Sequence, residues 1–357
     1  LVKTGDLVTR DMLYNGNPQE EQGAIVCRVS NSFLRFGSFE IFAARNDVKS
    51  LKTLVDYTIQ YHYPHIGKPS KDTYLQFFRE VSERSKNMVI HWQRVGFVHG
   101  VMNTDNLSIL GQTIDYGPYG WLEDYDPNWT PNTTDAQHRR YRFGNQPKIV
   151  LWNLLQLANA LFPLIEEATP LEDILEEHRQ AYEKAYHSMM LSKLGLCNDD
   201  LPAYLISNLT VLLSKTSSDM TLFFRELSNL GSMDPDKLWN IVQSTSYFNK
   251  AELETKEVRE QWNNWFDAYS SAIAKENRPT EERLAEMKKI NPKYVLRNYM
   301  AQMAIDQAET GDYTLIDELH QLLLHPYDEQ AEMEKWYAKR PKWAENKIGC
   351  SMLSCSS

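Results

Sequence analysis

The hydrophobic pattern changes its period along the chain, and this change constrains the fold most. Residues 1–45 alternate between apolar and polar positions, which is typical of β-strands, and Asn15-Gly16 is a turn signal between two such runs. From Asp47 the apolar residues recur at helical spacing, and residues 148–325 keep a helical pattern almost throughout. Strands that precede a long run of helices predict an α+β fold.

Two helices and an irregular segment are expected before the long helical region. The first helix begins after Asp47 and ends at Pro64, and Ser70 is the candidate N-cap of the second. Within residues 96–120, short apolar pieces alternate with glycines and polar residues, which predicts short strands joined by a loop. After Pro326 we expect a loosely packed tail.

Composition restricts the classes of partner. The chain has 357 residues, of which 42% are hydrophobic, so it can bury a large core and is not a disordered protein. Its net charge of −10 argues against a nucleic-acid partner, because phosphate binding requires a basic face. The most apolar stretch, residues 149–165, is interrupted by Asn153 and is too short to cross a bilayer, so we expect a buried helix and no membrane span.

The most informative stretch is a loop that begins at His99 and contains Asp105 and Asn106, followed nine residues later by Asp115 in the sequence Asp-Tyr-Gly. Protein kinases use H-R-D-x-x-x-x-N and then D-F-G to place a catalytic base and the magnesium ligands on neighbouring loops. On that template Asn106 and Asp115 take the metal-ligand positions, whereas Val101 stands where the catalytic aspartate would be. We therefore expect a kinase-shaped metal site whose base is displaced.

Asn106 and Asp115 have the chemistry of a magnesium site, because an amide oxygen and a carboxylate suit an ion that keeps several waters and bridges nucleotide phosphates. They therefore predict an ATP site. Asp105 is the carboxylate in this loop that is free to act as a base on an incoming hydroxyl. The competing interpretation is that Asp-Tyr-Gly is a common turn without a ligand. His99 is interpreted as a structural residue that holds the loop.

Two groups of arginines are candidates for binding anions. Arg28 and Arg35 follow the predicted hairpin, and their guanidinium groups would suit phosphate recognition and the charge of a leaving pyrophosphate. The alternative is that both form surface ion pairs. A second cluster, Arg139-Arg140-Tyr141-Arg142, would either dock an acidic substrate or pair with the acidic helices that follow it.

At this point the sequence resembles a known family. It closely resembles the selenoprotein O family of protein adenylyltransferases, whose eukaryotic members end in selenocysteine-Ser-Ser where this chain ends in Cys355-Ser356-Ser357. The matching motifs span nearly the whole chain and are Arg35-Phe-Gly-Ser-Phe-Glu, His99-Gly-Val-Met-Asn-Thr-Asp-Asn, Ile114-Asp-Tyr-Gly-Pro-Tyr-Gly, Arg142-Phe-Gly-Asn-Gln-Pro and Asn291-Pro-Lys-Tyr-Val-Leu-Arg-Asn.

The resemblance implies a protein-kinase-like (pseudokinase) fold of the α+β class. Residues 1–45 would be the remainder of a β N-lobe, residues 46–200 a C-lobe with the catalytic and metal-binding loops, residues 201–330 a helical C-terminal region, and residues 331–357 a tail. The family's glycine-rich strands and nucleotide-binding lysine would lie upstream of the region that matches Leu1. We therefore expect the N-terminal part to be absent from this chain.

The same resemblance implies an activity and roles for the site residues. The protein would bind ATP in a flipped orientation and transfer AMP to Ser, Thr or Tyr hydroxyls of protein substrates. Asp105 would accept the proton, Asn106 and Asp115 would hold Mg²⁺ or Mn²⁺, and Arg28 and Arg35 would contact the distal phosphates. The alternatives are a small-molecule or protein kinase, against which Val101 argues, and a catalytically incomplete scaffold that binds nucleotide.

Two further expectations concern the tail and the location of the protein. Cys350 and Cys355 would either form a reversible disulfide that exchanges with a redox partner, or be spare exposed thiols. The four scattered cysteines of the chain favour a reducing compartment. Eukaryotic members of the family are mitochondrial, and the resemblance therefore implies a mitochondrial location.

Overall fold

The structure is a computed structural model that describes residues 2–11, 18–197, 203–345, 347, 350 and 353. In the described residues, helices predominate over two small antiparallel sheets. One sheet pairs β1 (Val2–Arg10) with β2 (Gln19–Ile25), and the other pairs β3 (Phe97–Val98) with β4 (Gly120–Trp121). The α+β class predicted from the sequence is confirmed.

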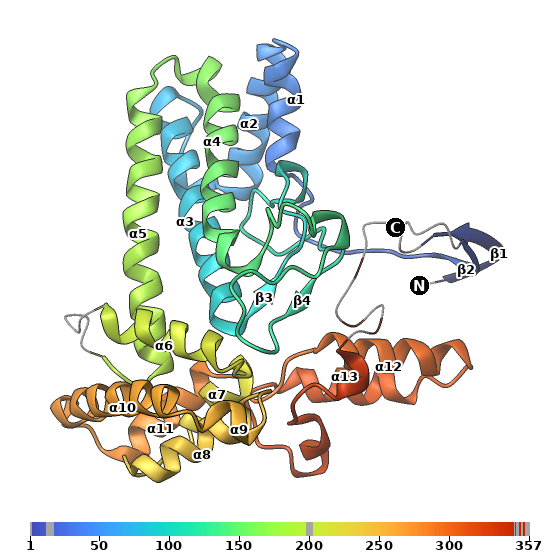
Figure 1. Cartoon of the computed structure of the whole chain (residues 1–357). Helices are drawn as coiled ribbons and strands as arrows, with labels where there is room; N and C mark the ends of the chain where they lie inside the picture. The colour runs from blue at the N-terminus through green and yellow to red at the C-terminus, as the bar shows by residue number, and fades with distance from the viewer. Residues whose placement is uncertain are drawn as a thin grey trace.

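The N-terminal strands form a hairpin that extends away from the helical body (Figure 1). Its register pairs Val2 with Ile25 and Arg10 with Gln19, as the alternating pattern predicts for two adjacent strands. The turn signal Asn15-Gly16 lies outside the described residues. Most side chains of both strands are exposed, so the described residues leave both faces of this hairpin largely uncovered.

The first three helices are α1 (Phe36–Ala44), α2 (Val48–His62) and α3 (Lys71–Val95). Asp47 caps α2 by accepting the Ser50 N–H at 3.0 Å, and Ser70 caps α3 by accepting the Thr73 N–H at 3.2 Å. Helix α3 ends at Gly96, whose φ of 74° is left-handed and therefore favours glycine. Both predicted helix starts are confirmed.

Helices α4 (Gln146–Ile165) and α5 (Thr169–Lys193) stand beside α3 (Figure 1). Residues 143–165 are long and apolar enough to cross a membrane by length and composition alone, but 56% of the apolar window is buried inside the protein. Leu154, Leu157 and Leu161 are fully buried, in a core shared with α1, α2 and α3. This burial agrees with the predicted core helix.

The irregular segment between α3 and α4 contains the candidate loops. The pairing of β3 with β4 brings residues 97–98 next to residues 120–121, and an isolated antiparallel bridge joins Leu107 to Thr113 between them in the sequence. The short strands expected here are therefore present. The 3₁₀ turns of the described chain are η1 (Pro64–Ile66), η2 (Thr104–Asn106), η3 (Thr133–Asp135), η4 (Phe143–Asn145), η5 (Ala331–Trp336) and η6 (Lys342–Ala344).

The C-terminal half is helical, and its first helices lie across the lower end of α5 (Figure 1). A second core lies among them, with Trp262 and Phe223 almost fully buried. The elements are α6 (Tyr204–Lys215), α7 (Met220–Leu227), α8 (Pro235–Thr245), α9 (Lys250–Leu253), α10 (Lys256–Glu276), α11 (Thr280–Ile290), α12 (Asn298–Glu309) and α13 (Thr314–Leu324).

A backbone hydrogen bond joins the segment after β4 to the C-terminal half, and a buried ion pair lies next to it. The Met220 N–H donates to the Glu123 carbonyl oxygen at 2.9 Å, next to Asp219, the N-cap of α7. The Arg297 guanidinium donates to both carboxylate oxygens of Asp219 at 2.7 and 2.9 Å, and both side chains are almost completely buried. Such a pair is stabilising only while both partners are present.

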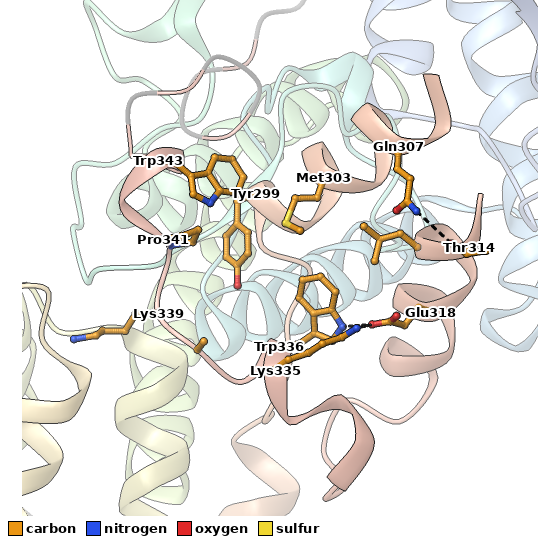
Figure 2. Close-up of a pocket in the computed structure, with 12 residues that line it drawn as sticks. Tyr299, Met303, Gln307, Thr314, Glu318, Lys335, Trp336, Lys339, Pro341 and Trp343 are labelled. Carbon is orange, nitrogen blue, oxygen red and sulfur yellow. Dashed lines mark hydrogen bonds and ion pairs between the residues drawn. The ribbon is translucent and has the colours of Figure 1, made fainter. Parts of the chain in front are cut away.

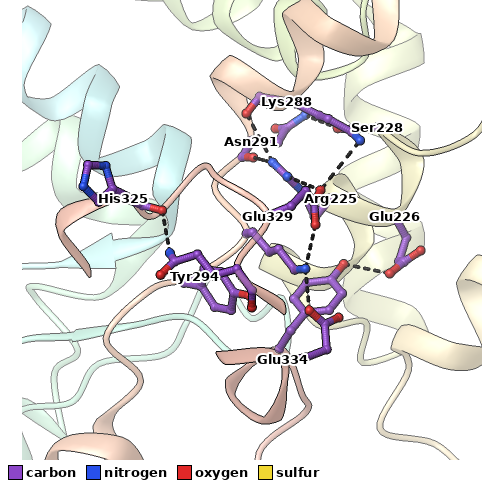
Figure 3. A network of polar contacts seen from close by, with 12 residues as sticks. Arg225, Glu226, Ser228, Lys288, Asn291, Tyr294, His325, Glu329 and Glu334 are labelled. Atoms are coloured by element: carbon purple, nitrogen blue, oxygen red, sulfur yellow. Dashed lines mark hydrogen bonds and ion pairs between the residues drawn. The ribbon is translucent and has the colours of Figure 1, made fainter. Parts of the chain in front are cut away.

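The described part of the tail after Pro326 is packed rather than loose, so that expectation was wrong. Buried Arg225 and Lys293 both bind the Glu329 carboxylate, at 2.6 and 2.7 Å, and Lys293 also binds Glu334 at 2.6 Å (Figure 3). A charge buried in the protein requires a partner, and the tail supplies these carboxylates. Trp336 is accordingly only 7% exposed.

Candidate active site

His99 anchors the loop of residues 99–106 from inside the protein. Its side chain is buried, its Nε2 donates to the Ile114 carbonyl oxygen at 2.9 Å, and its Nδ1 accepts the Val101 N–H at 3.4 Å. Burial lowers the pKa of His99, so the imidazole is neutral, with one nitrogen as donor and the other as acceptor. The histidine therefore joins this loop to the residue before Asp115, in agreement with the structural role predicted for it.

Two amide side chains on α4 hold the backbone around the same loop. Gln146 accepts the His99 N–H at 3.0 Å and donates to the Phe97 carbonyl oxygen at 2.8 Å. Asn153 donates to the Met102 carbonyl oxygen at 2.9 Å. Both amides are fully buried, and an unpaired polar group at that depth is costly. The loop is therefore fixed to the core helix by hydrogen bonds that water cannot easily replace.

A third amide, Asn132, donates to the Gly100 carbonyl oxygen at 3.1 Å and is also buried. The sequence analysis did not identify these supporting residues. It noted Asn153 only as an interruption of an apolar stretch. A polar residue on the buried face of a helix was the available signal, because such a residue must find a hydrogen-bond partner inside the protein.

The Asp115 carboxylate binds two arginine side chains at the site. Arg28 Nη1 lies 2.7 Å from its Oδ1, and Arg35 Nε donates to its Oδ2. These contacts lower the pKa of Asp115, chiefly through the hydrogen bond from Arg35, and the same hydrogen bond raises the pKa of Arg35. Asp115 also has a left-handed φ of 52°, a conformation that is uncommon for residues other than glycine and is enriched at functional sites.

Asn106 is oriented by its own loop. Its Nδ2 donates to the Val101 carbonyl oxygen at 2.9 Å, which commits the nitrogen and leaves Oδ1 as the acceptor for a ligand. An isolated antiparallel bridge pairs Leu107, the residue after Asn106, with Thr113, two residues before Asp115. The segments that carry the two predicted metal ligands are therefore neighbours, and joint binding of a metal by the two side chains stays a prediction.

Arg35 lies at the start of α1, and Asp105 lies in the 3₁₀ turn η2 that packs against this helix. Arg35 forms an antiparallel bridge with Ser108, and the negative charge of Asp105 contributes to the raised pKa of Arg35. The exposed Asp105 carboxylate lies directly against Gly37, where a Cβ atom would be 2.0 Å from its Oδ1. Gly37 is therefore a further candidate residue of the site, and the sequence did not reveal it because its role depends on this close approach.

A pocket of about 600 Å³ opens beside Asp115. Its lining includes Arg28, Phe33 and Tyr116, and the Arg28 guanidinium lies 5.3 Å from the centre of the Phe33 ring. Residues 105–106 do not line this pocket. The pocket therefore presents Arg28 and the Asp115 carboxylate, whereas Arg35 is not among its lining residues.

A second pocket, of about 540 Å³, lies in the C-terminal region and shares no residue with this site (Figure 2). It is lined by aromatic side chains, including Tyr299 and Trp343, and by Glu318, which is paired with Lys335 at 2.7 Å. Among the described residues, no group of three or more His, Cys, Asp or Glu side chains could hold a metal ion. The second pocket therefore contains none of the residues predicted from the sequence to carry the chemistry.

The predicted cysteine pair is only partly described. Cys350 is a free, buried thiol whose pKa burial raises, whereas Cys355 lies outside the described residues. A disulfide between them, and a redox partner acting through it, stay predictions.

Comparison with known proteins identifies the family. The family model described as protein adenylyltransferase SelO matches residues 1–324. A protein nucleotidyltransferase YdiU from Flavobacterium johnsoniae is 55% identical over 359 residues, covering 100% of this chain and 68% of the relative. YdiU proteins from Rhodopirellula baltica and Aromatoleum aromaticum are 48% and 49% identical, each covering 100% of this chain and 69% and 68% of the relative.

These relatives correct one expectation. They come from bacteria, so the mitochondrial location implied by the eukaryotic members of the family was wrong. The family match spans most of the sequence and includes the loop at His99, the Asp115 turn and both arginines of the site. The chain therefore belongs to the SelO family of protein adenylyltransferases.

Proposed function

We propose that this protein transfers AMP from ATP to hydroxyl groups of protein substrates at the site around Asp115. The observation that carries the proposal is the convergence of Arg28 and Arg35 on the Asp115 carboxylate, beside Asp105. A triphosphate with a divalent cation is complementary to this arrangement, because its oxygens suit the guanidinium groups and its cation suits the carboxylate. Membership of an adenylyltransferase family supports the same activity.

The residues present fit a divalent cation, Mg²⁺ or Mn²⁺. Asn106 Oδ1 and the Asp115 carboxylate would hold it, since Mg²⁺ needs only one or two protein oxygens when phosphates and waters supply the rest. When bound, the ion would supply positive charge that stabilises the phosphate oxygens. Each carboxylate oxygen of Asp115 is bound by one of the two arginines, so a cation would have to replace at least one of these contacts when the arginines turn to the phosphates.

Each side chain of the site would have its own role in the transfer of AMP. The acceptor oxygen attacks the α-phosphorus, the bond to pyrophosphate breaks, and the acceptor proton passes to Asp105. Asp105 suits this role because it is exposed on the loop and no side chain of the described residues blocks it with an ion pair. Arg28 and Arg35 would hold the distal phosphates and stabilise the charge of the departing pyrophosphate. The nucleotide would then be flipped relative to a kinase, as the family resemblance implies.

We further propose the kinase-like division of the chain predicted from its sequence. Residues 1–45 would belong to the N-lobe and residues 46–200 to the C-lobe, followed by a helical region to residue 330 and a tail from residue 331. The grouping of buried side chains supports this division in part. One core is built between residues 36 and 174, a second mostly between residues 189 and 287, and a third from residue 294 onward.

The test measures which phosphate of ATP is transferred to an acceptor protein. With the purified protein, Mg²⁺ and an acceptor protein, label in the α-phosphate should appear on the acceptor, and label in the γ-phosphate should not. Asp105→Asn should slow transfer by roughly 10²–10⁴-fold while ATP still binds, because it removes the general base. Asp115→Asn should abolish the rise in melting temperature that ATP with Mg²⁺ produces. Transfer of the γ label alone would establish a phosphotransferase and overturn the proposal.

A further inference from the structure

The turn of residues 139–142, here called the basic turn, carries three arginines on a chain whose net charge is −10. Arg139 and Arg140 are exposed and Arg142 is half-buried. Two interpretations were open from the sequence, namely docking of an acidic substrate or pairing with the acidic helices downstream. The contacts of the three side chains distinguish between them.

The backbone of the basic turn is held in a fixed conformation. Buried Asp135 accepts the N–H groups of Arg140 and Tyr141 at 2.8 and 2.7 Å, and Asn145 donates to the Arg140 carbonyl oxygen at 2.5 Å. Arg139 adopts a left-handed φ of 48° between these contacts. Asp135 therefore satisfies backbone donors, and the arginine side chains project from a turn that its carboxylate organises.

No carboxylate in the described part of the chain lies within 4.0 Å of these three guanidinium groups. Arg140 lies 4.5 Å from the centre of the Trp152 ring on α4, and Arg142 donates to the Arg139 carbonyl oxygen at 3.0 Å. Pairing with the downstream acidic helices is therefore not observed, and the positive charge of the basic turn is uncompensated by ion pairs among the described residues.

The basic turn is attached to the loop that carries Asp105. The Tyr141 hydroxyl donates to Asn103 Oδ1, two residues before Asp105 in the sequence. Asn132, in the same segment as the turn, donates to the Gly100 carbonyl oxygen at 3.1 Å. The turn that carries the arginines is thus attached by hydrogen bonds to the loop that carries the predicted base.

We propose that the basic turn docks an acidic segment of the protein substrate, so that the modified hydroxyl lies near Asp or Glu side chains in its own sequence. This inference rests on the function proposed above and names the substrate class for that site. Charge complementarity carries it: three guanidinium groups that form no ion pair among the described residues, on a turn hydrogen-bonded to the loop of the predicted base, attract carboxylates and raise the rate of productive encounter. Arg140, stacked on Trp152, would provide the most rigid of the three contacts.

The first experiment compares two acceptor peptides that share one hydroxyl and differ only in flanking residues, Glu and Asp in one and Gln and Asn in the other. The ratio of their kcat/KM values cancels any general loss of activity. For the unaltered protein we expect the acidic peptide to be favoured roughly tenfold at low salt, since each exposed ion pair contributes little alone and three act together. The preference should shrink at high ionic strength, because salt screens exposed charges.

Charge reversal provides the decisive variant. In Arg139→Glu/Arg142→Glu, which keeps the Arg140–Trp152 contact, the preference should invert in favour of a peptide flanked by lysines. A structural defect in the turn would lower all rates and would not produce this inversion. The matched control, Lys250→Glu/Lys256→Glu, reverses two exposed charges on α9 and α10 and should leave the preference unchanged.

Direct binding separates this inference from the proposed function. The fluorescence anisotropy of a labelled acidic peptide should report binding by the unaltered protein and at least tenfold weaker binding by the double arginine variant, whether or not AMP is transferred. Equal binding to the two proteins, or equal kcat/KM for the two peptides, would overturn the docking proposal. Tighter binding of a single-stranded oligonucleotide than of the peptide would assign the basic turn to nucleic acid instead. Failure of transfer with intact peptide binding would count against the proposed function alone.

Discussion

Gly37→Ala is a small substitution whose effect can be worked out from one contact. A Cβ atom at Gly37 would lie 2.0 Å from Asp105 Oδ1 and 2.9 Å from its Cγ, whereas ordinary van der Waals contacts begin at 3.4 Å. The carboxylate must therefore move by about 1.4 Å or rotate away. The backbone nitrogen of Asp105, at 3.4 Å from the new methyl group, can stay where it is.

A displacement of this size should affect catalysis more than folding. A 1 Å misplacement of a catalytic group costs roughly 10²-fold in rate, so the kcat for AMP transfer should fall by roughly 10–100-fold, or about 1.4–2.7 kcal/mol in the activation barrier. Gly37 lies in the first turn of α1, where alanine is favoured over glycine by roughly 0.5–1 kcal/mol, so the melting temperature should not fall. The assay is transfer of α-labelled AMP, with ATP affinity measured alongside.

Two further variants make this prediction specific. Gly231→Ala is the matched control, because no atom lies within 4 Å of a Cβ at that position, and its transfer rate should be unchanged. Gly37→Ala combined with Asp105→Asn should be no slower than Asp105→Asn alone, since both act through the same carboxylate. A Gly37→Ala protein with the normal rate, or rate losses that multiply in the double variant, would refute the assignment of Asp105 as the base.

Two predictions concern stability. Arg297→Met leaves the Asp219 carboxylate buried without its partner and should lower the free energy of unfolding by roughly 3–5 kcal/mol in urea titrations, whereas Lys289→Met at an exposed ion pair should cost no more than about 1 kcal/mol. A loss for Arg297→Met as small as that of the control would contradict the reasoning. Burial lowers the pKa of His178 to about 4. Between pH ~6.5 and 4 the unfolded chain therefore binds a proton at this residue and the folded protein does not. Stability should therefore be lost as the pH falls from ~6.5 towards 4. His178→Gln should reduce the difference in unfolding free energy between pH 7 and pH 5 by about 2 kcal/mol. An unchanged difference would show that His178 does not titrate in this way.

Local sequence signals predicted the helices well. Asp47 and Ser70 were identified as helix starts because a cap is a contact between residues three apart, and both hydrogen bonds are present. The tail after Pro326 was misjudged for the opposite reason. Its packing depends on Arg225 and Lys293, which lie far away in the sequence and whose burial no local pattern reveals.

The candidate site divides in the same way. The kinase-like spacing of Asn106 and Asp115 predicted neighbouring loops, and the isolated bridge between Leu107 and Thr113 pairs the two segments that carry them. Arg28 and Arg35 could be assigned either to phosphate or to surface ion pairs from the sequence, and the structure shows both on Asp115. Gln146 carried no local signal, since its two hydrogen bonds reach residues almost fifty positions earlier.

The sequence by itself determined which segments are helical, where the candidate loops lie, and which side chains could hold a cation or accept a proton, because these depend on residue type and on neighbours within a few positions. Only the tertiary structure decided which distant groups meet. The guanidinium groups on the Asp115 carboxylate, the amides that hold the 99–106 loop and the attachment of the basic turn to that loop all join chain segments tens of residues apart. Their contacts depend on how the cores pack, and packing is a property of the whole chain.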